Sequence, residues 1–422
     1  MVILQKINHK LNKVGPAIVE GRFLNKLDIF IKVYSGKISK SADRTIGLFG
    51  KWILSKTTIV NPKKIMFITF QGDYTCNPKY ITEKILEEKI DCEIVWTSRK
   101  YNLSKNNIFP PNVKIVEQYT FDFYKELASS KIWIANSVEF LKSPLPKKRN
   151  QYLIETWHGS LGIKRFGKNE NSGTRWVKAA ELNGKIANYC ISNSVFETKV
   201  LKETFWPNTP ILEFGHPRND IFFDGYYEKR NQLKEKICSI YGINPDKKIL
   251  LYAPTFRDSH TFSCYHLDFE KVRSALTERF GGEWEILVRF HPTVRKERKK
   301  MRIKNKVKDV TIYPDIQEIM AISDVAITDY SSWIYDFVLT QRPGFIFAVD
   351  IEKYNTERGF YYPLETTPFP IAVDNDELVN NIMQFDTDLY EKKVINFLND
   401  KICFEDGHAS ERVAKVIKAL IE

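Results

Sequence analysis

The sequence has no uninterrupted apolar run of the ~18 residues that a membrane-spanning helix needs, and its N-terminus lacks the order of basic, apolar and small residues typical of a signal peptide. Its six cysteines are scattered without a C-x-x-C pair, and no H-x-x-x-H pattern occurs. The ligand spacing of a zinc site is therefore missing. These absences predict a cytoplasmic protein with reduced thiols and no metal centre.

Two nucleotide-binding motifs are also missing. The sequence contains neither G-x-x-x-x-G-K-[ST] nor G-x-G-x-x-G, which leaves P-loop hydrolysis and a glycine-rich dinucleotide site unsupported. D-x-D spacings occur at Asp374/Asp376 and Asp386/Asp388, in late polar segments that are typical of helix caps. We therefore expect no cofactor.

Acidic residues are in the minority: 52 Asp and Glu stand against 64 Lys and Arg, for a formal net charge of +12. The first 64 residues contain 13 basic and only 3 acidic side chains, and a second basic cluster runs from Arg289 to Lys308. No aromatic residue interrupts positions 295–308, which disfavours a nucleic-acid surface. The expected partners are an anionic membrane surface and phosphate-rich molecules, and not nucleic acid.

The 422 residues suffice for two or three domains. Residues 1–62 alternate apolar and basic positions at helical spacing, which is typical of short basic helices that either lie on an anionic bilayer or pack on the next domain. After them, short β-rich runs alternate with polar helical stretches, which predicts parallel sheets built from βαβ units. Strands are expected at 65–70, 92–97, 113–116, 132–135, 152–155, 189–192 and 211–214, and again at 249–252, 285–290, 325–328 and 345–349.

The polar stretch 224–248 separates the two series of strands. We therefore predict an α/β protein with two doubly wound, Rossmann-like domains, at 63–223 and 224–422, which face each other across a cleft. Residues 1–62 form a basic helical segment in front of them.

Ligands of such sheets bind beyond the carboxyl ends of the strands, and polar side chains gather there. His158 follows one of the last strands of the first series, and Gly159 after it leaves room for a substrate. An imidazole with an ordinary pKa near 6.5 suits a general base for a hydroxyl at neutral pH. Four nearby residues are candidates to orient its ring: Asn136, Ser137, Glu155 and Asn193.

In the second series, Ser331 and Ser332 precede an apolar helical run. We expect one of them to cap that helix, whose N-terminus would suit a phosphate. Asp336, one turn further on, would hold the loop or a ligand hydroxyl. Arg257 can grip phosphate with its planar guanidinium, and His291 can donate to a phosphate oxygen.

Several separate segments resemble one family. They read ETWHGS from residue 155, LYAPTFRD from 251, VRFHP from 288, ITDYSSWIYD from 327 and RGFY from 358. In this order they resemble the CDP-glycerol glycerophosphotransferase family, and the resemblance covers roughly residues 63–415. It implies a glycosyltransferase B-like fold, peripheral membrane attachment and a role in building teichoic acids or related polyol-phosphate polymers.

The resemblance also implies roles for individual residues, with His158 as the base that deprotonates the acceptor hydroxyl. The residues implied to bind the donor diphosphate are Thr255, Arg257, His291, Ser331, Ser332 and Asp336. Those implied to lie near the donor nucleotide or polyol are Asp329, Arg358 and Gly359. Those implied to lie on the acceptor side are Gly159, Lys164 and His216. The segment 159–164 lacks a proline that many family members have, and this departure concerns the acceptor more than the reaction.

The resulting prediction is a transferase at the cytoplasmic face of the membrane. It would move glycerol phosphate from CDP-glycerol to a hydroxyl of a lipid-linked saccharide or a growing polyol-phosphate chain and release CMP. Two alternatives stay open: a transferase of ribitol phosphate from CDP-ribitol, and a nucleotide-sugar glycosyltransferase or epimerase on the same fold.

Overall fold

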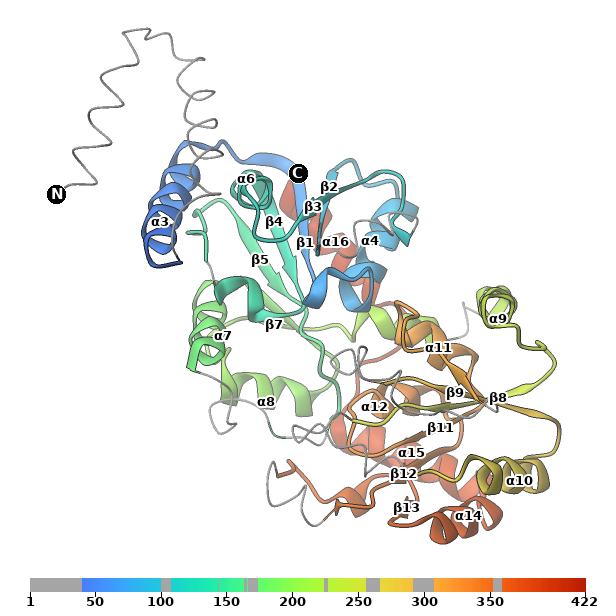
Figure 1. Ribbon diagram of the computed structural model, residues 1–422. Helices are drawn as coiled ribbons and strands as arrows, with labels where there is room; N and C mark the ends of the chain where they lie inside the picture. The colour runs from blue at the N-terminus through green and yellow to red at the C-terminus, as the bar shows by residue number, and fades with distance from the viewer. Residues whose placement is uncertain are drawn as a thin grey trace, which may run out of the picture.

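A computed structural model describes residues 40–99, 108–142, 144–162, 165, 174–223, 227–255, 266–290, 307–351 and 359–422. Figure 1 shows two lobes, each built around one twisted sheet, with the chain passing from the first to the second through the region of α9. The amphipathic helices that we predicted before residue 40 lie outside the described residues.

The first lobe contains a seven-stranded parallel sheet, in the order β3-β2-β1-β4-β5-β6-β7 within the described part of the chain. Its strands are β1 (Asn61–Ile68), β2 (Glu93–Ser98), β3 (Val113–Glu117), β4 (Ser130–Ala135), β5 (Tyr152–Glu155), β6 (Tyr189–Ser192) and β7 (Ile211–Glu213). Its helices are α3 (Lys40–Thr57), α4 (Cys76–Glu87), α6 (Phe121–Ser129), α7 (Thr174–Ile186) and α8 (Val195–Thr204). A 3-10 helix, η4 (Pro217–Phe222), follows β7.

Successive side chains of β1 point to opposite faces of this sheet. Met66 and Ile68 pack with residues of α6, α7 and α8, whereas Ile65 and Phe67 pack with residues of α4. Both faces are covered, which explains why the strands read as continuous apolar runs.

The second lobe repeats this arrangement with the order β10-β9-β8-β11-β12-β13, again parallel in the residues described. Its strands are β8 (Lys248–Tyr252), β9 (Trp284–Val288), β10 (Lys308–Asp309), β11 (Val325–Thr328), β12 (Gly344–Phe347) and β13 (Ile371–Ala372). Its helices are α9 (Tyr227–Tyr241), α10 (Phe269–Phe280), α11 (Ile316–Ile322), α12 (Ile334–Phe337), α14 (Asn375–Met383) and α15 (Thr387–Lys401).

The last helix, α16 (Ala409–Ile421), belongs to the core of the first lobe. Its Val413, Ile417 and Ile421 pack on the face of the first sheet that α4 also covers, and Figure 1 shows the red end of the chain beside β1 and α4. The sequence predicts that all of 224–422 belongs to the second domain. The structure instead returns the end of the chain to the first lobe, because the apolar face of α16 is buried there.

The predicted α/β architecture with two doubly wound sheets is confirmed, and each predicted strand is present. The two D-x-D spacings mark helix caps, as predicted: Asp374 accepts from the backbone N–H of Glu377 at the start of α14, and Asp386 accepts from that of Leu389 at the start of α15. Strands β10 and β13 were not predicted.

Candidate active site

The candidate site lies where the order of strands reverses in each sheet, which is where doubly wound sheets bind ligands. In the first lobe, the loops after β1 and β4 meet: the backbone N–H of Phe70 donates to Asn136 Oδ1 at 2.8 Å. In the second lobe, the loops after β8 and β11 meet: the backbone N–H of Thr255 donates to Asp329 Oδ1 at 2.8 Å. The structure thus pairs Thr255 with Asp329, two predicted site residues.

His158 sits on a tight turn directly after β5. Trp157 has a φ of +49°, a conformation that side-chain-bearing residues seldom adopt, and its backbone N–H donates to Glu155 Oε1 at 3.0 Å. The ring of His158 packs against Trp157 with centroids 4.4 Å apart and stacks on Phe70 at 6.4 Å. These contacts fix the turn and the plane of the imidazole.

Of the four candidates to orient the imidazole, Asn136 makes the contact, through its backbone: its carbonyl oxygen lies 2.6 Å from His158 Nδ1. A carbonyl oxygen only accepts, so Nδ1 carries the hydrogen and donates it. In the neutral ring, Nε2 then holds a lone pair. His158 is exposed on its open side, and desolvation by the protein around the rest of the ring is the largest effect on its pKa, which it lowers. The positive charge of Arg218 acts in the same direction, whereas the hydrogen bond to Asn136 and the charge of Glu197 act against it. The ring is neutral at pH 7 and can accept a proton.

His158 opens onto a cavity of about 180 Å³ that both lobes line. From the second lobe come Ser332 and Tyr361, and the remaining lining residues are Trp157, His158, Gly159, Ser160, Gly162, Arg165, Phe196, Glu197 and Val200. The lobes approach closely at Gly162, where an added Cβ would lie 3.2 Å from Cβ of Ser332. The predicted base and one predicted diphosphate ligand therefore face the same space.

Asp336 is not among the residues that line this cavity, and its contacts agree with the other predicted role, that of holding the loop. It is 2% exposed, and its carboxylate accepts from Arg218 Nε at 2.9 Å and from Gln317 Nε2 at 3.0 Å. Arg218 also donates to the carbonyl oxygen of Gly159. The pair joins η4 and the His158 turn to α12 of the second lobe, so Asp336 positions the two lobes. Sequence reasoning gave Arg218 no role.

Ser331 and Ser332 lie in the turn before α12 and are partly exposed. The N-cap residue of α12 is Trp333, with no side-chain cap hydrogen bond, so the prediction that a serine caps this helix is wrong. The backbone N–H groups of Ile334 and Tyr335 bond instead to the carbonyl oxygens of the two serines. This leaves Ser332 at the cavity.

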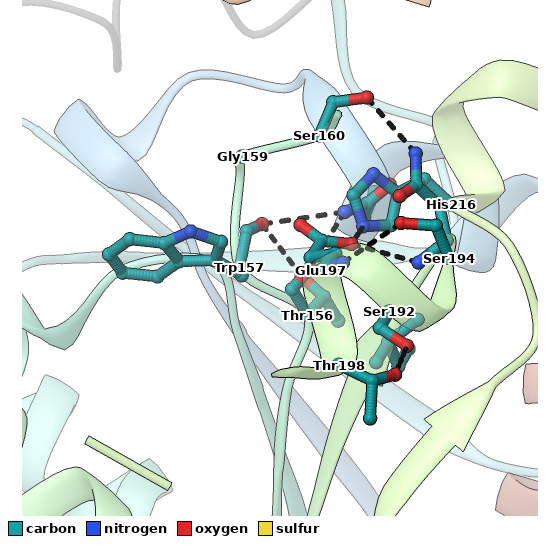
Figure 2. Close-up of polar contacts among 12 residues, drawn as sticks. Thr156, Trp157, Gly159, Ser160, Ser192, Ser194, Glu197, Thr198 and His216 are labelled. Carbon is teal, nitrogen blue, oxygen red and sulfur yellow. Dashed lines mark hydrogen bonds and ion pairs between the residues drawn. The ribbon is translucent and has the colours of Figure 1, made fainter. Parts of the chain in front are cut away.

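His216 is completely buried, whereas we placed it on the acceptor side. Its Nε2 lies 2.9 Å from Glu197 Oε2, and Glu197 lines the cavity. His216 thus reaches the site through Glu197, a residue that sequence reasoning missed. Figure 2 shows the carboxylate of Glu197 with the turn of Trp157 and Gly159 on one side and His216 on the other.

Gly359 has a φ of +68°, which favours glycine, and its carbonyl oxygen accepts from the backbone N–H of Arg165 at 3.2 Å. This bond links the segment after the His158 turn to the second lobe. Four predicted site residues lie outside the described residues: Lys164, Arg257, His291 and Arg358.

Among the residues described, no group of three or more His, Cys, Asp and Glu side chains has the geometry to hold a metal ion. In the same part of the chain, no helix is both long and apolar enough to cross a membrane. The five cysteines described there are free thiols.

The family model of CDP-glycerol:poly(glycerophosphate) glycerophosphotransferases matches residues 51–419. The chain belongs to this family. A teichoic acid poly(glycerol phosphate) polymerase of Bacillus spizizenii is 30% identical over 84% of this chain and 92% of its own length. A teichoic acid glycerol-phosphate transferase of Staphylococcus aureus is 31% identical over 86% of this chain and 95% of its own length.

Other proteins of teichoic acid synthesis are similar as well. A solved structure of the wall teichoic acid polymerase TagF matches with a TM-score of 0.77 and 27% identity, over 96% of this chain and 99% of that chain. A teichoic acid ribitol-phosphate primase of Bacillus spizizenii is 30% identical over 70% of this chain and 76% of its own length. The chain spans about half the length of a Staphylococcus epidermidis polymerase relative, 52% of which it covers.

Proposed function

We propose that this protein transfers glycerol phosphate from CDP-glycerol to a hydroxyl group of an acceptor and releases CMP. The observation that carries the proposal is the hydrogen bonding of His158 together with its position in the cavity. Its Nδ1 donates to a carbonyl oxygen, its Nε2 keeps a lone pair, and it shares a cavity with Ser332 of the opposite lobe. Membership of the glycerophosphotransferase family supports the choice of donor.

In the proposed step, the acceptor hydroxyl oxygen attacks the phosphorus that carries the glycerol. The new O–P bond forms as the bond from this phosphorus to the bridging oxygen breaks, and CMP leaves with the electron pair. Nε2 of His158 takes the hydroxyl proton. Rate enhancement then depends on positioning and on donors and positive charge at the transferring group, for which we assign Ser331, Ser332, Arg257 and His291.

The proposal also covers the acceptor and the question of a cofactor. The acceptor is a lipid-linked saccharide or a growing polyol-phosphate chain, and no cofactor takes part. CDP-ribitol is the second candidate donor, because the ribitol-phosphate primase is as similar to this chain in percent identity as the glycerol-phosphate polymerase is.

We further propose peripheral attachment to the anionic cytoplasmic face of the membrane. Helix α3 supports it, because Phe49 and Trp52 are 63% and 51% exposed and their rings stack with centroids 6.2 Å apart. Exposed aromatic side chains beside basic residues such as Lys56 suit the interface of an anionic bilayer.

The deciding experiment compares purified wild-type protein with His158→Ala in CMP release from CDP-glycerol and a synthetic lipid-linked acceptor. General-base help is worth ~10²–10⁴-fold, so we expect turnover to fall by about that factor while the Kd for CDP-glycerol, measured by calorimetry, stays unchanged. His408→Ala is the matched control, because the side chain of His408 is 66% exposed outside the cavity.

Wild-type turnover in His158→Ala would refute the assigned base. The same assay with CDP-ribitol and UDP-sugars in place of CDP-glycerol tests the donor. Release of nucleotide only from a UDP-sugar would refute the proposed reaction.

A further inference from the structure

Glu197 on α8 has one carboxylate oxygen that is occupied and one that is not. Oε2 lies 2.9 Å from His216 Nε2 and accepts from the backbone N–H of Asn193 at 2.8 Å. Oε1 is buried and has no hydrogen-bond partner. An ionised carboxylate has acceptor capacity at both oxygens, and a buried acceptor without a donor is costly. The unoccupied oxygen can therefore accept a hydrogen bond from a group that enters the cavity lined by Glu197.

The surroundings of Glu197 fix its position. The backbone N–H of Glu197 donates to Oγ of Ser194, the N-cap residue of α8, at 2.9 Å. Glu197 is only 3% exposed. Nε2 of His216 lies within ion-pair distance of Oε2 and closes off that side of the carboxylate. His216 is itself held by its backbone N–H, which donates to the carboxylate of Glu405. The carboxylate is thus preorganised by groups that contact only Oε2.

Oε1 faces the segment that carries His158. A Cβ added to Gly159 would lie 3.5 Å from Glu197 Oε1 and 2.7 Å from Trp157 Nε1, so a glycine keeps this space open. Glu197 and His158 line the same cavity, and the charge of Glu197 acts on the pKa of His158. A ligand group that donates to Oε1 would therefore lie next to the group that attacks.

We propose that Glu197 binds a second hydroxyl of the acceptor, on the carbon next to the attacking hydroxyl, and so selects acceptors that end in a vicinal diol. This inference rests on the proposed function and on the second of its two acceptors, the growing polyol-phosphate chain. A terminal glycerol phosphate unit presents two hydroxyls on neighbouring carbons: one loses its proton to His158, and the other donates to Glu197 Oε1. A carboxylate would repel the phosphate of the acceptor, so the hydroxyl end enters first.

The test compares two acceptors that differ by one oxygen atom, a lipid ending in glycerol phosphate and the same lipid ending in 1,3-propanediol phosphate. Both offer a primary hydroxyl, and only the first has the neighbouring hydroxyl. A hydrogen bond to a charged group predicts a kcat/KM about 10-fold or more lower for the propanediol acceptor with wild-type protein. In Glu197→Gln we expect kcat/KM for the glycerol acceptor to fall to that level and the difference between the acceptors to disappear.

Glu203→Gln is the matched control, because Glu203 lies on the same helix with its side chain 62% exposed. It should discriminate between the acceptors as wild-type protein does. The Kd for CDP-glycerol should be the same in all three proteins, since the contact is on the acceptor side.

Equal use of both acceptors by wild-type protein would overturn the proposal, whether or not Glu197→Gln folds. Undiminished discrimination in a folded Glu197→Gln protein would also overturn it, since another residue would then bind the hydroxyl. Absence of CMP release with either acceptor, by contrast, would refute the proposed function itself.

Discussion

His158 is held by a carbonyl oxygen, and this partner determines its chemistry. A carboxylate beside Nδ1 would favour the protonated ring, whereas the carbonyl of Asn136 fixes the tautomer without adding a negative charge. Desolvation then lowers the pKa of the ring. This effect outweighs the hydrogen bond to Asn136 and the charge of Glu197, which raise the pKa, and it favours the neutral imidazole with its Nε2 lone pair available.

This protonation state predicts the pH dependence of the reaction. Below its pKa the ring is protonated and cannot act as a base, so kcat/KM rises with pH and levels off once the ring is neutral. Because the pKa of His158 is lowered, we expect the acid limb of kcat/KM to lie below pH 6.5, the ordinary value for histidine. Initial rates of CMP release between pH 5 and 8 measure this limb.

A limb centred above pH 6.5 would contradict the lowered pKa of His158. Far-ultraviolet circular dichroism of the same samples separates a titration from acid unfolding. In His158→Ala the limb should disappear from the residual activity.

The sequence predicted the roles of site residues that directly follow a strand. It did not predict the roles of residues that act through tertiary contacts. His158 and Ser332 follow strand ends, and both line the cavity. Arg218 and Asp336 are 118 positions apart in the sequence, so no local sequence pattern indicates their ion pair. Glu197 reads as an ordinary polar residue of a helix, and its role depends on His216 and Gly159, which come from other turns.

The strands were predictable because each is a short run of buried apolar residues bounded by polar loops. The predicted ranges 152–155, 189–192 and 325–328 agree with β5, β6 and β11 at both ends. Strands β10 and β13 have two residues each, Lys308–Asp309 and Ile371–Ala372, which is too short for a pattern. The position of α16 was not predictable either. Its apolar face could pack on either of the two sheets, and only the folded structure shows that it packs on the first.

Helix α3 packs on the first lobe, as one reading of the basic segment predicts, and it keeps exposed the side chains that the bilayer reading needs. Leu54 packs on the core of the first lobe, and Ser55 Oγ donates to the carbonyl oxygen of Pro146 at 2.9 Å. Phe49 and Trp52 stay exposed. One face of the helix thus docks on the protein and another is free to meet a bilayer.

We expect the double substitution Phe49→Ser and Trp52→Ser to weaken binding to vesicles that contain phosphatidylglycerol by about 10-fold or more. Burying a large apolar side chain is worth ~1.5–3 kcal/mol, and two are lost here. Sedimentation with vesicles measures the bound fraction. Ile240→Ser is the control, since Ile240 is 57% exposed on α9. Unchanged sedimentation of the double variant would exclude α3 as the attachment site.

The two lobes are joined on a second side, away from the His158 cavity, by a buried ion-pair cluster. Lys79 of α4, 5% exposed, places its Nζ 2.7 Å from Asp315 Oδ2 and also contacts Glu318 of α11. The hydroxyl of Tyr80 donates to Asp315 at 3.0 Å. Burial opposes the charge of Lys79, but the surrounding carboxylates outweigh it and raise its pKa, so the lysine is protonated at physiological pH.

Removal of this lysine should separate the lobes. In Lys79→Ala, Asp315 and Glu318 would face each other without a cation, and breaking a buried pair in this way costs ~3–5 kcal/mol. Opening the contact between α4 and α11 exposes both carboxylates to water, which lowers the cost of their charges, and it draws Ser332 away from His158. We therefore expect a larger radius of gyration in X-ray scattering and a lower kcat/KM for CDP-glycerol.

Lys84→Ala, on the same helix and paired with the half-exposed Glu87, should change neither quantity. A Lys79→Ala protein with wild-type dimensions and activity but a lower melting temperature would show that the cluster stabilises the lobes without setting their separation.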